Sequence, residues 1–394
     1  MRTLILGAGG VGSGAARHLS ALRPDLDLRI ADLYEEAAQR VAAELGPRAE
    51  GIAVDLHDPA SLAPALDGVD AVLHTAGPFY RNARPLLEAA AERGIAYLDI
   101  DDDDDMLLSL LGDEELRGRA EESGARLVVG AGTTPGMSNL VARRSIDALD
   151  EAQDVQITML LPLAVAKRFS PAVLDHMVHI STGEVLAQRD GEITPIPAYA
   201  EPREEVTPPG AQQSVPALTA GHGETVMLAR SFPHLQEVTV RLSWLGEQGN
   251  ATWRMITAIA RGAEGEIEGL GATATQVLVH LIRAGALDEL LASEGVPTVG
   301  TLVEVQGLRN GQPVRLRTLM DLLGKRDVPP EMRQDPTAVA AAIGLDALLD
   351  GRITGTGVLT PELCFDGEDL LRRFEADSTV LFVEDEIVEG PAAQ

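Results

Sequence analysis

Apolar residues in the first 130 positions follow two alternating patterns. Short, nearly continuous apolar runs have the length of strands and lie at residues 3–7, 26–32, 50–55, 70–77, 96–100 and 125–132. Segments with helical spacing separate them, at residues 10–22, 34–46, 59–67, 83–93 and about 104–123. Continuous apolar strands that alternate with amphipathic helices are typical of a parallel sheet covered on both faces. The pattern therefore predicts an α/β, doubly wound Rossmann domain.

The pattern changes after Pro135. One more helix is expected there, and from about residue 153 the strands become longer and alternate apolar with polar positions. Asn310-Gly311 between two such runs predicts a tight β-hairpin, and helices are expected at 250–261 and 273–284. These features predict a second, α+β domain built on a mostly antiparallel sheet.

The change of pattern also places the domain boundary. We expect a dinucleotide-binding domain at 1–132 and a substrate and dimerisation domain at 133–336, with C-terminal helices within 337–376 packing back on the first domain. The proline-rich stretch 195–218 has no periodicity, so it is expected to be an excursion over the surface, either a lid or a connector.

A glycine motif stands between the first strand and the first helix. Gly7, Gly9 and Gly12 form GxGxxG, and with Gly10 and Val11 they make up the turn that we expect to bind a cofactor. In this motif the first glycine permits the tight turn, the second lets the backbone approach a pyrophosphate, and the third lets helix and strand pack closely. The N–H groups that begin the helix then face the phosphates. The alternative is a glycine-rich turn without a ligand.

The cofactor indicated is NAD rather than NADP. Asp32 ends the second predicted strand, where a carboxylate can accept hydrogen bonds from both ribose hydroxyls and would repel a 2′-phosphate. No arginine follows at 33 or 34. Thr75, Ala76 and Gly77 lie at the C-terminal edge of the fourth predicted strand, where small residues leave room for the cofactor.

Composition and charge exclude several classes of partner. The formal net charge of −29 argues against nucleic acid and anionic membranes, because phosphate contacts need clustered Lys and Arg. The single cysteine, Cys364, suits a reducing compartment. No basic segment followed by an apolar one opens the chain, and no apolar run reaches the length of a membrane span. A cytoplasmic protein is therefore expected.

The chain resembles the saccharopine dehydrogenase-like oxidoreductases, and among them the lysine 6-dehydrogenases most. The segments that carry this resemblance are LGAGGVG (6–12), AD (31–32), YLD (97–99), GTTPGMSNLVA (132–142), ARSFPHL (229–235) and GVLTPE (357–362). The resemblance implies NAD(P)-dependent oxidation of an amine, or reduction of an imine, in an amino acid-like substrate. It also implies a homodimer.

The resemblance further implies that Asp99, the aspartate of YLD, faces the substrate amine. Its position agrees, because ligands of doubly wound sheets bind at the carboxyl ends of the strands. A carboxylate there could hold an ammonium group or accept its proton. The alternative is a buried carboxylate that caps a loop. The following run, Asp101–Asp105, is expected to cap a helix or lie in solvent.

Further site candidates lie outside the cofactor motif. His176 is a candidate base, His222 lies in the polar loop AGHGE, and Arg168 could hold a substrate carboxylate. Ser138 and Asn139 place polar side chains at a helix start, for cofactor or substrate contact, with plain packing as the alternative. No metal site is expected, because hydride transfer needs none and the ligand spacings are lacking.

Two rival functions stay open. A C=C reductase of the same superfamily would need a wide apolar groove, which the apolar LLPLAV at 160–165 keeps possible. A non-catalytic NAD-binding sensor would bind the cofactor without turning over any substrate.

Overall fold

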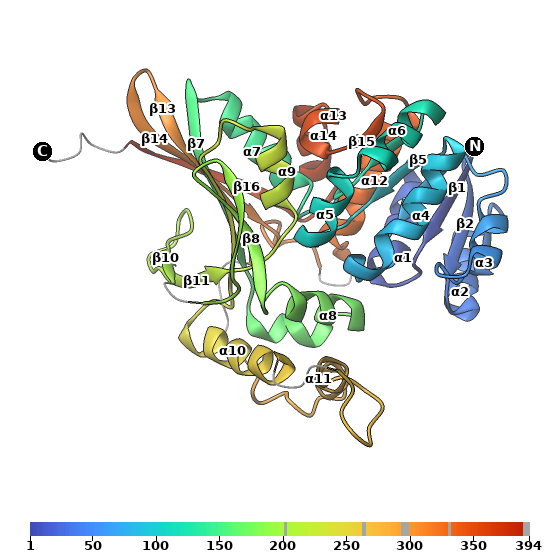
Figure 1. The fold of residues 1–394 in the computed structure, drawn as a ribbon, viewed down its shortest axis with the longest axis horizontal. Helices are drawn as coiled ribbons and strands as arrows, with labels where there is room; N and C mark the ends of the chain where they lie inside the picture. The colour runs from blue at the N-terminus through green and yellow to red at the C-terminus, as the bar shows by residue number, and fades with distance from the viewer. Residues whose placement is uncertain (201–202, 262–264, 293–298, 330–331, 389–394) are drawn as a thin grey trace, which may run out of the picture. The chain divides into compact units, whose positions relative to one another are not determined.

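The computed structural model describes residues 1–200, 203–261, 265–292, 299–329 and 332–388 (Figure 1). The chain divides into two compact units. Unit 1 comprises residues 1–143 and 326–379, and unit 2 comprises residues 144–325 and the chain from Val380. No helix within the described residues is long and apolar enough to cross a membrane.

Unit 1 is built on a parallel sheet of seven strands in its described part, in the order β15-β6-β5-β4-β1-β2-β3. The strands are β1 (Arg2–Leu6), β2 (Asp27–Asp32), β3 (Ala49–Ala53), β4 (Ala71–His74), β5 (Ala96–Asp99), β6 (Arg126–Val128) and β15 (Gly357–Leu359). The helices are α1 (Gly10–Leu22), α2 (Glu35–Leu45), α3 (Pro59–Ala65), α4 (Phe79–Arg93), α5 (Asp104–Leu111), α6 (Glu114–Ser123), α12 (Pro336–Leu349), α13 (Pro361–Cys364) and α14 (Gly367–Asp377). The predicted doubly wound sheet is confirmed.

Two features of unit 1 differ from the sequence pattern. The segment expected as one helix over 104–123 is two helices, because Gly112 ends α5 and the Asp113 side chain caps α6 by accepting from the Leu116 N–H. The strand β15 was not predicted, since three residues are too few to show a period.

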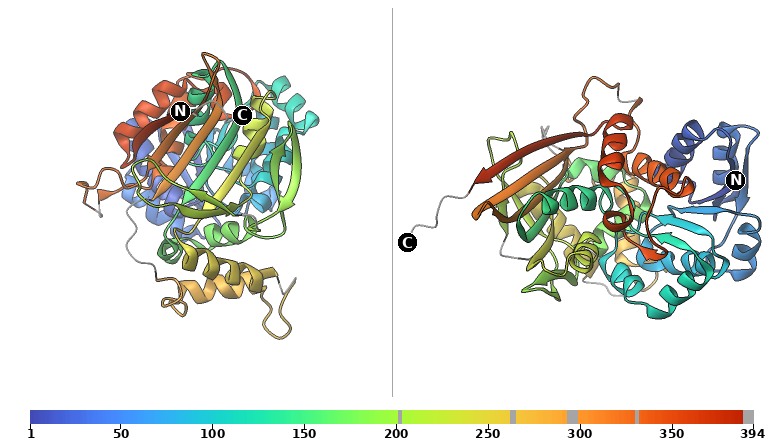
Figure 2. Two further views of the ribbon diagram at one scale, coloured as in Figure 1. Left: turned by 90° about the vertical axis from the view of Figure 1, so that its left-hand side faces the viewer. Right: turned by 90° about the horizontal axis from the view of Figure 1, so that it is seen from above.

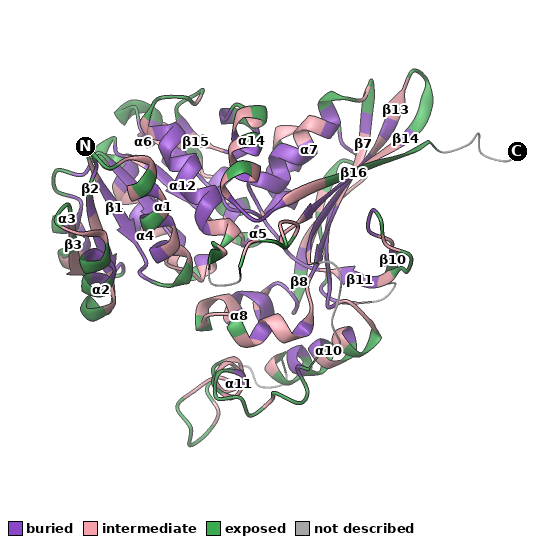
Figure 3. Cartoon of the chain, turned by 180° about the vertical axis from the view of Figure 1, so that it is seen from behind, coloured by how far each residue is buried: buried purple, intermediate pink, exposed green. Residues whose placement is uncertain are grey.

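Helix α12 is the most deeply buried helix of unit 1. Eleven consecutive residues, 338–348, are buried, and Figure 3 shows the helix almost wholly in the buried colour. It packs against α1, α14, β4 and β5. The approach to α1 is close enough that a Cβ on Gly14 would lie 2.9 Å from the Ala338 Cβ. A helix that is apolar all round needs such surroundings.

Unit 2 contains a mixed, mostly antiparallel sheet of nine strands within the described residues; the left view of Figure 2 shows it face on. The strands are β7 (Glu151–Leu160), β8 (Glu184–Arg189), β9 (Glu192–Pro197), β10 (Glu204–Val206), β11 (Val215–Thr219), β12 (Glu237–Ser243), β13 (Gly300–Arg309), β14 (Gln312–Asp321) and β16 (Leu381–Val388). Only the β7–β12 pair is parallel among the pairs described. The predicted α+β class is confirmed.

The helices of unit 2 are α8 (Pro171–His179), α9 (Glu224–Ser231), α10 (Glu247–Arg261) and α11 (Ala274–Arg283), with a short 3-10 helix at Leu163–Arg168. Helix α7 (Met137–Asp147) begins in unit 1 and ends in unit 2. The predicted hairpin is confirmed, because Asn310 (φ 54°) and Gly311 (φ 73°) connect β13 to β14 in a tight two-residue turn.

The proline-rich stretch 195–218, predicted to be an excursion over the surface without periodic structure, contains strands. It includes the end of β9, all of β10 and most of β11, and residues 201–202 lie outside the described part. Proline is tolerated in β9 because this strand pairs with β8 alone among the described strands and is therefore an edge strand. Pro216 of β11 is in register with Glu205 of β10 and lies outside the part of β11 that pairs with β12.

Candidate functional site

The glycine-rich turn of unit 1 connects β1 to α1 and leaves space where a phosphate could lie. Gly7 has φ +104°, which an L side chain rarely adopts, and a Cβ on Gly12 would stand 1.8 Å from the Gly7 carbonyl oxygen. A Cβ on Gly9 would meet no atom within 4 Å. No side chain caps α1, and its first turn has no acidic residue. The turn is therefore closed on the inside and open at the helix N-terminus, as a diphosphate requires.

Asp32 connects the end of β2 to this turn. Its Oδ2 accepts a hydrogen bond from the Ala8 N–H (2.8 Å), and its Oδ1 accepts one from the Tyr34 N–H (3.0 Å). Each carboxylate oxygen can accept another bond, so the ribose role predicted for Asp32 is compatible with these contacts. Leu33 and Tyr34 beside it are 60% and 72% exposed, which offers uncovered apolar surface next to the carboxylate.

The loop after β4 is tied to the glycine-rich turn. The Thr75 hydroxyl donates to the Leu6 carbonyl (3.0 Å), and Asn82 Nδ2 donates to the carbonyls of Ala76 and Gly77 (both 3.1 Å). The structure thus gathers all three predicted loop residues at the carboxyl end of the sheet. Asn82 was missed from the sequence, because nothing in a helical pattern marks a residue that holds a preceding loop.

Asp99 lies at the end of β5 in a buried polar network. Its Oδ1 accepts from the N–H groups of Gly130 (2.7 Å) and Asp101 (3.1 Å), and its Oδ2 accepts from the Tyr97 hydroxyl (2.8 Å). The same hydroxyl lies 2.9 Å from His74 Nδ1, so it accepts the Nδ1 proton. Asp99 is fully buried. These contacts fit the alternative prediction for Asp99, in which it is a buried carboxylate that caps a loop.

Burial governs the charge states in this network. Burial raises the pKa of Asp99 to about 6, although the N–H groups of Gly130 and Asp101 act in the opposite direction. Burial lowers the pKa of His74 to about 3, so this imidazole stays neutral. The pKa of Tyr97 is raised, first by burial and then by the Asp99 carboxylate. Asp99 is therefore the member of this network whose charge changes near pH 6, while the His74 imidazole and the Tyr97 hydroxyl stay neutral.

The aspartate run after β5 is not the solvent-facing segment predicted from the sequence. Asp101, Asp103 and Asp104 are buried, whereas Asp102 is half-buried and Asp105 is exposed. Backbone N–H groups of this loop donate to its carboxylates: Asp101 Oδ1 accepts from the Asp103 N–H (3.0 Å). Carboxylate oxygens of residues 101, 102 and 103 lie within 4.8 Å of one another. Burial, followed by the charges of Asp99 and Asp103, raises the pKa of Asp101 well above its usual range.

The helix-start role predicted for this run is confirmed for Asp104 and Asp105, which lie in the first turn of α5 and accept from the N–H groups of Asp105 (3.0 Å) and Met106 (2.8 Å). Asp103 occupies the N-cap position of α5, but its side chain forms no cap bond there. Its Oδ2 accepts instead from the Tyr80 N–H (2.8 Å) in the first turn of α4. The carboxylate therefore satisfies the neighbouring helix, which only the tertiary fold brings within reach.

Ser138 and Asn139 are fully buried at the start of α7. Asn139 Oδ1 accepts from the Gly136 N–H (3.2 Å), and its Nδ2 donates to Glu362 Oε2 (3.0 Å). Arg143 donates to the Glu362 carbonyl in the same region. These bonds join the chain around residue 139 to α13. They fit the alternative prediction, in which Asn139 is a packing residue and not a ligand contact.

Unit 2 brings two predicted histidines together. The rings of His176 on α8 and His222 before α9 meet edge to face, with centroids 5.6 Å apart. His222 Nδ1 is hydrogen-bonded to Glu224 Oε2, and all three side chains are buried. Sequence reasoning missed Glu224, although its place two residues after His222 was a usable signal. Arg168, the predicted carboxylate clamp, is exposed at the end of the 3-10 helix.

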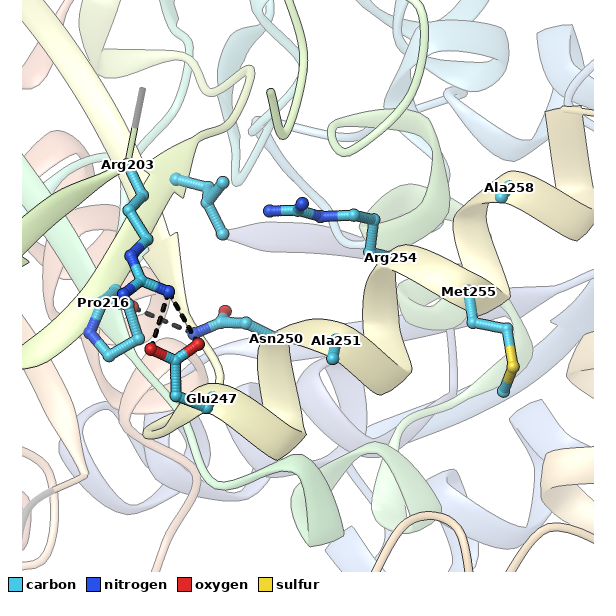
Figure 4. Close-up of a pocket in the computed structure, with 9 residues that line it drawn as sticks. Arg203, Pro216, Glu247, Asn250, Ala251, Arg254, Met255 and Ala258 are labelled. Carbon is cyan, nitrogen blue, oxygen red and sulfur yellow. Dashed lines mark hydrogen bonds and ion pairs between the residues drawn. The ribbon is translucent and has the colours of Figure 1, made fainter. Parts of the chain in front are cut away.

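A separate pocket lies between β11 and α10 in unit 2 (Figure 4). Its volume is about 370 Å³, and apolar side chains such as Leu218 and Met255 line it together with Arg203 and Arg254. Arg203 forms an ion pair with Glu247 (2.6 Å), and Asn250 Nδ2 donates to the Pro216 carbonyl (3.0 Å). None of the predicted site residues lines this pocket.

Comparisons with known proteins agree with this architecture. Residues 3–125 match the family model of the saccharopine dehydrogenase NADP binding domain. Among solved structures, apo saccharopine dehydrogenase (L-Glu forming) from Saccharomyces cerevisiae is similar with a TM-score of 0.68 and 15% identity, over 98% of this chain and 99% of that one. An apo scyllo-inositol dehydrogenase from Lactobacillus casei gives a TM-score of 0.45 and 11% identity, over 95% and 93%. No curated protein sequence matches the chain. At 15% identity, the likeness to the saccharopine dehydrogenase structure establishes the fold.

Proposed function

We propose that the protein is an NAD-dependent oxidoreductase of the saccharopine dehydrogenase-like family that oxidises an amine of an amino acid-like substrate, or reduces the corresponding imine. The observation that carries the proposal is the turn at 7–12, which is open at Gly9 and hydrogen-bonded to Asp32. The family model over residues 3–125 and the saccharopine dehydrogenase fold support the same reaction class.

NAD is favoured over NADP by charge. The Asp32 carboxylate faces the turn, and within residues 33–36 the chain offers Leu, Tyr and two glutamates but no arginine. A 2′-phosphate placed beside Asp32 would meet like charge, whereas two ribose hydroxyls would find acceptors. The matching family model is that of an NADP binding domain, so the preference for NAD has to be tested by titration with both coenzymes.

The bound cofactor would supply the acceptor for a hydride. The chain must then provide a group that removes a proton from the substrate ammonium, because only a neutral amine releases hydride readily. We assign Asp99 to holding the loop of 99–103, since both its oxygens accept hydrogen bonds from that loop, Gly130 and Tyr97. This leaves His176 and His222 as the proton-transfer candidates from the predicted set, and we expect the active form to be a homodimer.

Two measurements test the proposal. Titration with NADH and NADPH should show tighter binding of NADH, and a screen with NAD against L-lysine, saccharopine and other ω-amino acids should show formation of NADH. Binding of NADH without turnover of any amine would favour a sensor. Oxidation of NADH by an enoyl substrate instead would favour the C=C reductase. Failure to bind either coenzyme would overturn the proposal.

A further inference from the structure

The pocket between β11 and α10 has one wall that a buried polar network holds in place. Asn250, which is 4% exposed, donates through Nδ2 to the carbonyls of Pro216 and Gly246 (both 3.0 Å). Its Oδ1 accepts from the Trp244 N–H (3.1 Å) and from the buried Tyr199 hydroxyl. Tyr199 has φ +53°, a backbone conformation that an aromatic residue seldom adopts. This wall is therefore preformed, as the walls of ligand pockets usually are.

Apolar side chains of α10 and β11 form the rest of the lining. Ala251, Met255 and Ala258 recur at helical spacing on α10, and all three are exposed, Met255 to 46%. Pro216 and Leu218 line the pocket from β11. An apolar stripe that stays in contact with water beside a concave site is typical of a surface that binds an apolar group.

Two arginines give the pocket a positive charge. Arg254 extends from α10 toward the side of the pocket where Arg203 lies (Figure 4), and Arg203 is paired with Glu247 (2.6 Å) and Glu205 (3.4 Å). The described residues that line the pocket thus include two cations and one carboxylate, in a chain whose formal net charge is −29. Burial raises the pKa of Tyr199, and the Arg254 charge opposes this, so the field of Arg254 reaches the buried network.

We propose that this pocket binds a small aliphatic monocarboxylate, with its carboxylate on Arg254 and its apolar chain between Leu218 and Met255. A guanidinium can hold a carboxylate through two parallel N–H bonds, and the apolar lining removes the chain from water. Neither arginine has to be unpaired, because a guanidinium has five N–H donors and can contact more than one carboxylate. The volume of about 370 Å³ is near the lower end of the range for ligand pockets, which suits a small molecule.

The charge of the lining selects the head group of the ligand. An ammonium group would meet the like charge of Arg254, and a dianionic phosphate would lie close to the Glu247 carboxylate. A single carboxylate matches the single excess positive charge of the lining. All residues of the site belong to unit 2, and none of them has a part in the proposed oxidoreductase function.

The two tryptophans of the chain provide a direct readout for this pocket. Both are buried beside it, since Trp244 bonds to Asn250 and Trp253 lies on α10, with their ring centroids 4.6 Å apart. Titration of the full chain with octanoate should change the tryptophan fluorescence saturably and release or take up heat in a calorimeter. Acetate, which lacks the chain, and octylamine, which carries the opposite charge, should each bind at least about tenfold more weakly. Inorganic phosphate should give no saturable change.

Two substitutions test the two halves of the site. Arg254→Gln changes an exposed residue, so the fold should be retained while octanoate affinity falls roughly 10- to 100-fold and NADH affinity stays unchanged. Met255→Gln should weaken octanoate and leave the weak binding of acetate as it is. Arg261→Gln is the matched control, since Arg261 ends the same helix, is exposed and is not among the described residues that line the pocket.

Three outcomes would overturn the proposal. Octanoate could fail to give a saturable signal in both fluorescence and calorimetry, or it could bind no more tightly than octylamine. It could also bind the wild type and both pocket variants equally, which would place it elsewhere on the protein. If the protein binds neither NADH nor NADPH, the proposed function fails, and the octanoate titration still decides whether this pocket is a carboxylate site.

Discussion

The carboxylate of Asp32 and the N–H of Ala8 are 2.8 Å apart, so the end of β2 holds the glycine-rich turn directly. The residue proposed to select the ribose therefore also shapes the loop proposed to bind the diphosphate. A change at Asp32 should act on both halves of the cofactor.

Replacing this carboxylate should weaken NADH binding and reduce discrimination against NADPH. For Asp32→Ala we expect a loss of about 2–3 kcal/mol in NADH affinity, roughly 30- to 150-fold, for the hydrogen bonds of a charged group. The measurement is fluorescence titration with both coenzymes. Asp27→Asn is the control, since Asp27 begins the same strand and is exposed beside Arg48. Unaltered NADH affinity in Asp32→Ala would rule out the ribose contact.

Alanine substitutions at two glycines of the turn should have different effects, one on NADH binding and the other on stability. A methyl group on Gly9 meets nothing within 4 Å, so Gly9→Ala should keep the melting temperature and lose NADH binding by tenfold or more. Gly12→Ala places its methyl 1.8 Å from the Gly7 carbonyl oxygen and should destabilise unit 1 by about 3 kcal/mol or more. Gly118→Ala on α6, also open, is the control. Thermal melts and NADH titration check all three variants. Normal NADH affinity in Gly9→Ala would argue against a diphosphate at this turn.

The buried aspartates should make stability depend on pH. Because the folded-state pKa values of Asp99 (about 6) and Asp101 are raised, folding favours their protonated forms. Their stabilising contribution is complete below about pH 4, the unfolded-state pKa, and is lost as pH rises through the folded-state values. Asp101→Asn should lessen this loss and raise stability at pH 8 relative to pH 4.

Denaturant melts at pH 4 and pH 8 measure this difference. Asp105→Asn provides the comparison, since Asp105 belongs to the same run and is exposed. A wild-type-like pH dependence in Asp101→Asn would mean that the Asp101 charge is compensated in the folded protein, for instance by a cation.

Asp346 of α12 connects α12 to α14 and to the segment after α1. Its carboxylate accepts from Arg352 (2.9 Å) and Arg373 (2.6 Å) and lies 3.4 Å from Arg23 of the segment after α1. Asp346→Asn leaves three guanidinium groups without this buried charge, so we expect a loss of about 3 kcal/mol in the free energy of unfolding. Urea melts test this, with the exposed Asp350→Asn as a milder comparison. Equal effects of both variants would contradict the central role of Asp346.

The periodic pattern predicted the elements best where burial repeats regularly. The first six elements of the chain, β1 to α3, begin and end within two residues of the predicted positions. A parallel strand covered on both faces must be apolar throughout, so its length can be read from the sequence. The Asn310-Gly311 turn was equally clear, since both residues tolerate positive φ. Short elements such as β10 and β15 gave no such signal.

The sequence by itself determined the doubly wound sheet, the hairpin, the glycine-rich turn and the place of Asp32 at a strand end, because each depends on spacing within one segment. Only the tertiary structure decided which acidic side chains are buried, that Asp103 binds the first turn of α4, and that Glu224 and His176 meet at His222. Burial and charge pairing arise between segments far apart in the chain, and no local pattern of residues records them.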